Sequence, residues 1–189
     1  MHMVQALRPM RWTADMVRAL PEDRNRCEVI EGELFVSPGP SWIHQHAVAA
    51  LFVRLYGFLR GSRAGHPLVA PADVEFSDDT LVQPDIFVVP LVHGKAPRRW
   101  EEVRQLLLAI EVSSPSTART DRVHKRELYL SRGAREYWVV DIDAQLIERW
   151  RAGDVRPEIL DGMIEWRPDD KSEPFVIDVA EYFAEVLDD

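Results

Sequence analysis

Hydrophobic positions recur along the chain with two different periods, and the alternation between them predicts a mixed β-sheet flanked by helices. Between residues 41 and 59 the apolar side chains fall on one stripe with helical spacing, which predicts a long amphipathic helix. The stripe contains Val48, Leu51, Phe52, Leu55 and Leu59. Short apolar runs bounded by turn residues predict β-strands at 68–76, 81–89, 106–113, 136–141 and 146–150.

Capping and turn residues place the elements of the first half of the chain. Thr13 can cap a short helix that ends before Pro21. Gly32 lies at a tight turn between two short strands, which predicts an N-terminal hairpin. The polar turn at 77–80 predicts a second hairpin, formed by the two long strands on either side of it.

A compact strand–helix–strand unit is predicted in the second half. A helix from about residue 120 to residue 132 separates two of the predicted strands, and Gly133 is placed to end it. Such a crossover should be right-handed, with its two strands parallel. We also expect short edge strands within residues 154–166 and a last helix over about 179–187. The fold class is therefore α/β (mixed α+β), and the length predicts one domain over residues 1–189.

Two of the apolar strands each contain an acid. Glu111 lies inside the run 106–113, and Asp85 follows Pro84 inside the run 81–89. A buried carboxylate is costly unless it is paired, hydrogen-bonded or bound to a metal. If the two strands are neighbours, the carboxylates meet at one end of the sheet, where hard oxygen ligands suit Mg²⁺ or Mn²⁺.

The helix that follows the Glu111 strand supplies a basic partner for this pair. Lys125 lies in that helix and could orient an attacking water or stabilise charge on a phosphoryl group. The backbone carbonyl of Val112 could complete the coordination of the metal. Simpler readings stay open: Asp85 could cap a turn, a buried arginine could neutralise Glu111, and Lys125 could face solvent.

The net charge of −9 argues against tight, nonspecific binding of bare duplex DNA. It is compatible with a nuclease, because bound cations reverse the sign of the local field. Basic residues do cluster around the predicted helix, although this cluster could be a solvated helix face. The cluster contains Arg119, Arg122, His124, Lys125, Arg126, Arg132 and Arg135.

The remaining composition limits other classes of protein. The single cysteine, Cys27, excludes an internal disulfide and a cysteine-rich zinc module. No apolar stretch is long enough to span a membrane, and residues 1–9 lack the apolar core of a signal peptide. We therefore expect a cytoplasmic protein with no membrane partner.

The two acids also carry a family resemblance. Pro84-Asp85 followed by Glu111-Val112-Ser113 resembles the PD-(D/E)XK nuclease signature, with Ser113 at the usual lysine position. Several branches of that superfamily carry the lysine on the following helix, as Lys125 would be here. Residues 110–117 and the block that follows resemble the Uma-two family of restriction-endonuclease-like proteins, and the resemblance covers about residues 13–151. The matching block contains Asp121, Lys125, Tyr129, Gly133, Glu136, Tyr137, Trp138, Val140 and Asp141.

The resemblance implies a restriction-endonuclease-like core and metal-dependent cleavage of DNA. Asp85 and Glu111 would hold Mg²⁺ or Mn²⁺, and Lys125 would take the place of the usual lysine. Cutting two strands needs two sites, which makes a homodimer plausible. The rival interpretation is a non-catalytic module that keeps the nuclease fold for binding protein or nucleic acid, which the acidic net charge favours.

Five further residues are candidates for accessory roles. Glu31 and Glu33 flank the hairpin turn and could approach the metal, or could be exposed turn acids. His44, which matches a family histidine at the start of the long helix, could contact a phosphate or water. Asp121 could cap its helix or orient Lys125, and Tyr129 could shield or hydrogen-bond Lys125.

Overall fold

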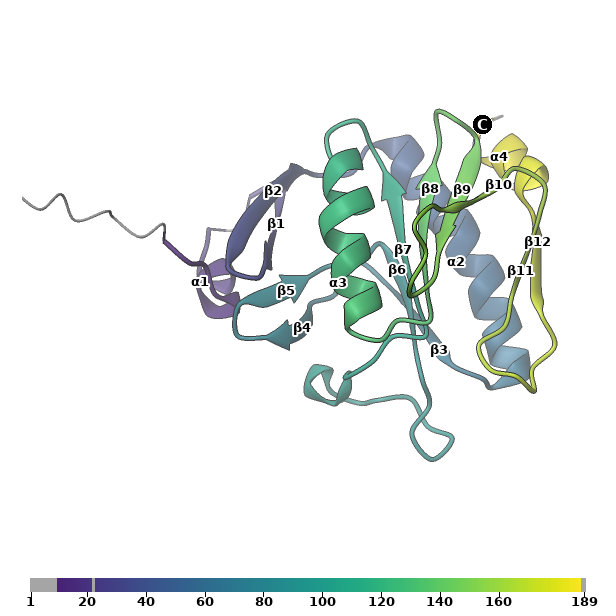
Figure 1. The fold of residues 1–189 in the computed structure, drawn as a ribbon, viewed down its shortest axis with the longest axis horizontal. Helices are drawn as coiled ribbons and strands as arrows, with labels where there is room; N and C mark the ends of the chain where they lie inside the picture. The colour runs from purple at the N-terminus through teal and green to yellow at the C-terminus, as the bar shows by residue number, and fades with distance from the viewer. Residues whose placement is uncertain (1–9, 22, 188–189) are drawn as a thin grey trace, which may run out of the picture.

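The computed structural model describes residues 10–21 and 23–187, so the prediction made for residues 1–9 lies outside the described residues. Its strands form three sheets, with four α-helices around them (Figure 1). The strands are β1 (Asn25–Ile30), β2 (Glu33–Pro38), β3 (His66–Val69), β4 (Val74–Ser77), β5 (Thr80–Val82), β6 (Ile86–Val89), β7 (Leu108–Ser113), β8 (Glu136–Asp141), β9 (Leu146–Trp150), β10 (Glu158–Leu160), β11 (Met163–Trp166) and β12 (Phe175–Asp178). The helices are α1 (Ala14–Arg18), α2 (Trp42–Ser62), α3 (Arg126–Ser131) and α4 (Val179–Leu187), with a 3₁₀ turn at Trp100–Glu102 and a π-helical segment at Thr120–Lys125.

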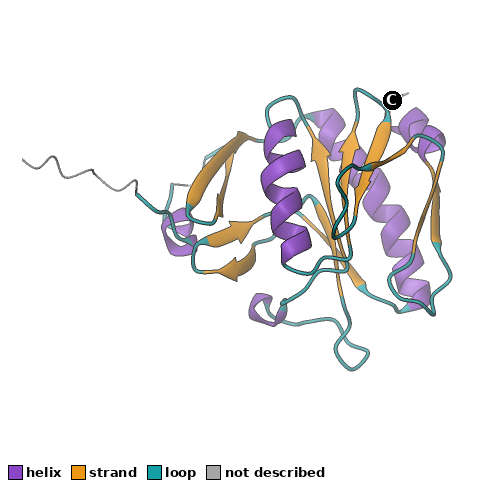
Figure 2. Ribbon diagram, in the orientation of Figure 1, coloured by secondary structure: helices purple, strands orange, loops and turns teal. Residues whose placement is uncertain are grey.

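The central sheet has six strands in the order β10-β9-β8-β7-β6-β3. β7 and β8 pair in parallel, which confirms the predicted strand–helix–strand unit, and the other neighbours in this sheet are antiparallel. α3 lies over one face of the sheet, and α2 and α4 lie over the other (Figures 1 and 2). The α/β class predicted from the hydrophobic pattern is confirmed.

The predicted helix ends are also confirmed. The Thr13 hydroxyl accepts a hydrogen bond from the Met16 amide, and the Ser41 hydroxyl accepts one from the His44 amide, as expected of N-caps. Gly133 has a φ of +85°, a left-handed conformation that glycine adopts at little cost, and it follows the end of α3. Among the described residues, none of the helices is both long enough and apolar enough to cross a membrane.

The predicted second hairpin is confirmed, since β4 and β5 pair antiparallel across the turn, but its two long strands are not continuous. Each of its two expected strands breaks in two, so that β3 and β6 pair in the central sheet while β4 and β5 join β1 and β2 in a four-stranded sheet of order β2-β1-β5-β4. The breaks fall at Pro71 and Pro84, where a proline removes a donor from the strand ladder. Asp85 directly follows the second break and therefore lies where the two sheets meet.

The region after β9 also differs from the prediction. β10 does extend the edge of the central sheet, but β11 leaves that sheet and pairs with β12 as a separate ribbon. Ile164 and Trp166 of this ribbon are buried in the core beside α2 and α4. The sequence predicted short edge strands in this region, but neither β12 nor its pairing with β11.

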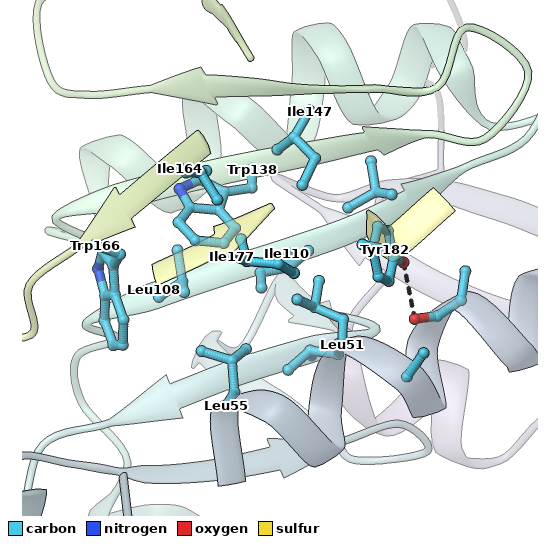
Figure 3. Close-up of a cluster of buried hydrophobic side chains, with 14 of the residues drawn as sticks. Leu51, Leu55, Leu108, Ile110, Trp138, Ile147, Ile164, Trp166, Ile177 and Tyr182 are labelled. Atoms are coloured by element: carbon cyan, nitrogen blue, oxygen red, sulfur yellow. Dashed lines mark hydrogen bonds between the residues drawn. The ribbon is translucent and has the colours of Figure 1, made fainter. Parts of the chain in front are cut away.

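The two faces of the central sheet differ in polarity, and β7 shows the difference because its side chains alternate between them. Leu108 and Ile110 of β7 pack with α2 and α4 in an apolar cluster that also contains Trp138. Figure 3 shows part of this cluster. Ala109 and Glu111 alternate with them and point to the opposite face, which α3 covers. This alternation places the Glu111 carboxylate under α3.

Candidate active site

The two acids identified in the sequence lie at the junction of the two larger sheets, beside a cavity of about 290 Å³. β6 and β7 are adjacent and antiparallel, so the start of β6 and the end of β7 come together. Asp85 and Glu111 both line the cavity, with Lys125 and His44. The end of β2 and the loop that leads from it into α2, residues 37–41, form another part of the wall.

Asp85 is only 2% exposed and accepts three hydrogen bonds or ion pairs. Its Oδ1 lies 2.8 Å from Nη1 of Arg26, and its Oδ2 lies 3.1 Å from Nε2 of His44. The amide of Val112 donates to the same Oδ2 at 2.8 Å. These contacts come from β1, α2 and β7, so Asp85 joins three elements and does not serve as a local turn cap.

The surroundings of Asp85 keep it ionised. Burial by itself would raise the pKa of this carboxyl, but the hydrogen bond with His44 and the charge of Arg26 outweigh burial and hold the pKa below its usual range. The buried arginine of this site, Arg26, therefore pairs with Asp85, and the cation that contacts Glu111 is Lys125. Arg26 was not identified from the sequence as a site residue.

Glu111 is 1% exposed and contacts the helical segment above it. Its Oε1 lies 3.1 Å from Nζ of Lys125 and accepts a hydrogen bond of 3.0 Å from the Tyr129 hydroxyl. Lys125 and Tyr129 are four residues apart and so lie on one face of the helix. The partner of the Tyr129 hydroxyl is therefore Glu111, whereas the sequence predicted Lys125.

Lys125 is buried among carboxylates and does not face solvent. Its Nζ lies 2.8 Å from Oε2 of Glu28 as well as 3.1 Å from Glu111. Burial lowers the pKa of this lysine, but the charges of Glu111 and Glu28 outweigh burial, so the pKa is raised and the ammonium stays protonated. Sequence reasoning missed Glu28, although an acid beside Val29 and Ile30 on a short strand gave the same signal as Glu111.

Asp121 lies near the lysine without a hydrogen bond to it. Its Oδ1 is 3.9 Å from Nζ of Lys125, and its backbone carbonyl accepts a hydrogen bond from the Tyr137 hydroxyl. The predicted N-cap role was wrong, because Asp121 lies inside the π-helical segment. Burial raises the pKa of Asp121 to about 6, against the opposing charge of Lys125.

Glu31 and Glu33 are not part of this group. Both are exposed at the β1–β2 turn, and the backbone carbonyl of Glu31 accepts a hydrogen bond from Arg11. The predicted basic cluster is also divided by its contacts. Arg122 pairs with Asp141 and Glu148, and Arg126 stacks over the Trp150 ring at 4.6 Å.

The sequence of residues 14–170 matches the model of the Uma2 family, described as "putative restriction endonuclease". The chain belongs to this family. Its fold is similar to the crystal structure of a putative nuclease of the DUF820 group from Anabaena variabilis ATCC 29413. The two share 19% sequence identity with a TM-score of 0.75 over 93% of this chain and 99% of the other, a likeness that shows the fold. No curated protein matches the sequence.

Most of the buried charged side chains among the described residues gather at the site of this Uma2 family member. Four carboxylates, those of Glu28, Asp85, Glu111 and Asp121, surround two permanent cations, Arg26 and Lys125. If all four are ionised, the group has an excess of two negative charges before His44 is counted. Burial accordingly raises the pKa of Glu111 well above its usual range; Lys125 opposes this shift, and the charge of Asp85 adds to it.

The donors of this group fit a hard divalent cation with few protein ligands. Within residues 10–21 and 23–187, no three acidic, histidine or cysteine side chains are arranged to hold a metal ion. Mg²⁺, however, is commonly held by one or two carboxylates, with water and substrate phosphate as its other ligands. When the four carboxylates are ionised, their excess of two negative charges beside the cavity suits such an ion.

Proposed function

We propose that this Uma2 family member is a nuclease that hydrolyses DNA phosphodiester bonds with Mg²⁺ or Mn²⁺. The observation that carries the proposal is the buried group of four carboxylates and two cations beside the cavity. A group with this excess of negative charge is expensive in a protein interior unless it binds protons or a cation. The family description supports nucleic acid as the substrate class.

Asp85, Glu111 and the carbonyl of Val112 are the proposed metal ligands. The N–H and C=O of one strand residue point toward the same neighbouring strand. Since the Val112 amide donates to Asp85, its carbonyl faces the Asp85 side of β7 as well. Glu111 would hold the metal through the same carboxylate that contacts Lys125 and Tyr129, whose hydrogen bonds both end on Oε1. When bound, the ion would polarise a phosphoryl oxygen and lower the pKa of a bound water.

Lys125 and His44 have distinct proposed roles. The raised pKa of Lys125 keeps it protonated, so it stabilises negative charge on the phosphoryl group and does not act as a base. His44 holds Asp85 in place through Nε2, and its Nδ1 is buried without a hydrogen-bond partner among the described residues. We assign His44 a role in orienting the Asp85 carboxylate.

Cleavage of plasmid and branched DNA in Mg²⁺ or Mn²⁺ tests the proposal. Asp85→Asn and Glu111→Gln should each reduce the cleavage rate on the order of 10³-fold, because a bound metal supplies several kcal/mol of transition-state stabilisation. Glu31→Gln and Glu33→Gln are the matched controls, because they remove exposed carboxylates of the hairpin, and they should cleave like the wild type. Equal cleavage by all five proteins would identify a contaminating nuclease and overturn the proposal.

A non-catalytic nuclease-fold module is the second candidate, favoured by the ion pairs of Lys125. This ammonium already pairs with Glu28 and Glu111 without any metal. Calorimetric titration with Mn²⁺ separates the two candidates. Binding that is lost in Asp85→Asn supports the nuclease, whereas no binding by the wild type supports the module.

A further inference from the structure

The buried carboxylate of Glu28 is used by neither the proposed metal site nor the apolar core. It is 4% exposed and lies on β1, between β2 and β5. Its two oxygens have different partners: Oε1 accepts a hydrogen bond of 2.7 Å from the backbone amide of Gln83, and Oε2 lies 2.8 Å from Nζ of Lys125. Glu28 therefore connects the lysine to the chain segment that leads into Asp85.

Lys125 divides its charge between two carboxylates that differ in their proposed use. Its distance to Glu28 is 2.8 Å and its distance to Glu111 is 3.1 Å. Of these acids, Glu111 lines the cavity of Asp85, and Glu28 does not. A cation on Glu111 would repel an ammonium held on the same carboxylate, whereas the contact with Glu28 could persist.

We propose that Glu28 is a positioning residue that retains Lys125 when Glu111 exchanges the ammonium for a divalent metal. This inference rests on the proposed function. Glu28 suits the task because the Gln83 amide and the pairing of β1 on both sides fix its position. A buried ammonium without any partner would be strongly unfavourable, so a second acceptor makes the exchange at Glu111 feasible.

The consequence is a coupling between Glu28 and metal affinity that passes through the lysine. Without the Glu28 charge, Glu111 is the only carboxylate to which Lys125 is hydrogen-bonded. A metal that binds Glu111 then displaces the ammonium and leaves it with no second carboxylate to accept its hydrogen bond. Glu28→Gln should therefore weaken metal binding by more than the loss of one nearby negative charge. The amide oxygen of the glutamine can still accept from Gln83, which preserves the local fold.

The test is the Mn²⁺ dissociation constant, measured by calorimetry on the full chain. Glu28→Gln should raise it by about 10- to 100-fold, the range for groups that support a metal ligand. Asp121→Asn is the matched control, because Asp121 also lies beside Lys125 but at 3.9 Å, too far for a hydrogen bond. It should raise the dissociation constant only a few-fold. In a Lys125→Met background, Glu28→Gln and Asp121→Asn should have the same small effect.

The contrary results are distinct. If Glu28→Gln weakens binding as strongly in the Lys125→Met background, Glu28 acts directly on the metal and the positioning role is wrong. Should Lys125→Met fail to fold, as judged by circular dichroism, equal effects of Glu28→Gln and Asp121→Asn with the lysine in place would overturn the inference. Loss of Mn²⁺ binding in Asp85→Asn would show that the proposed site is real whatever the result at Glu28. No binding by the wild type would overturn both proposals.

Discussion

The two faces of the central sheet are built from the same strands but from different chemistry. Toward α2 and α4, β7 presents Leu108 and Ile110 to an apolar cluster that includes two tryptophans (Figure 3). Toward α3, the same strand presents Glu111 to Lys125 and a tyrosine hydroxyl. The first face stabilises the fold by removing apolar surface from water. On the second face, desolvation of the charges opposes the attraction between them.

This difference shows where stability and proposed function lie. A buried ion group is weak evidence for stability, because apolar residues of similar volume often serve the fold equally well. Its presence under α3, on the sheet face opposite a well-packed apolar cluster, is what marks this side of the sheet as the candidate site. Substitutions on the two faces should therefore have separable effects on stability and on metal binding.

The largest expected effect on stability comes from removing the buried cation alone, compared with removing the cation together with two of its carboxylates. Lys125→Met alone should lower the free energy of unfolding by about 3–5 kcal/mol, because it leaves buried carboxylates without their cation. The triple variant Glu28→Leu, Glu111→Leu and Lys125→Met should recover that loss, while binding no Mn²⁺. Urea denaturation measures the stability of both variants, and calorimetry measures Mn²⁺ binding. A triple variant less stable than the single one would show that the charges stabilise the fold.

On the apolar face, Leu51→Ala should lower the free energy of unfolding by about 3 kcal/mol, because it leaves a cavity among fully buried side chains. Leu51 lies on α2, away from the carboxylates, so the Mn²⁺ dissociation constant of the folded protein should not change. Denaturation and calorimetry on the same preparation check this. A changed dissociation constant would show that the two faces are coupled.

The free energy of unfolding should depend on pH through the titration of Asp121. Its pKa of about 6 in the folded protein lies above the ordinary value of about 3.9. Between these two pH values the folded state therefore binds more protons than the unfolded state. The corresponding stabilisation is fully present below about pH 4 and is lost as the pH rises through about 6, and it amounts to on the order of 2–3 kcal/mol. Asp121→Asn should remove this part of the slope. Urea denaturation between about pH 4 and 7.5 measures it, with Glu33→Gln expected to keep the wild-type slope.

The smallest effects should come from a matched pair of tyrosines, one on each face. The Tyr182 hydroxyl donates to the Ala47 carbonyl at 2.9 Å, and the Tyr129 hydroxyl donates to Glu111. Each change to phenylalanine should cost about 1 kcal/mol of stability, the usual contribution of one hydrogen bond. Only Tyr129→Phe should weaken Mn²⁺ binding, by about tenfold, because it alone touches a proposed ligand. Equal dissociation constants for the two variants would contradict the assignment of Glu111.

Sequence reasoning identified most of the elements because period, caps and turn residues act locally. The cap at Thr13 and the end of α3 at Gly133 are examples. It identified the second hairpin but not the break in each of its strands, because apolar residues continue on both sides of the two prolines. It also missed the partner of β11, since a strand pattern states which face is buried but not which strand lies beside it.

For the candidate site, the sequence by itself determined that Asp85 and Glu111 lie on buried strands and that a lysine follows on a helix. Apolar neighbours reveal a misplaced acid because desolvation is costly wherever the residue lies in the chain. Only the tertiary structure decided the partners: Arg26 for Asp85, Tyr129 for Glu111, and Glu28 for the lysine. Ion pairs act over a few ångströms between residues far apart in sequence, so the meeting of two sheets under α3 determines which charges compensate one another.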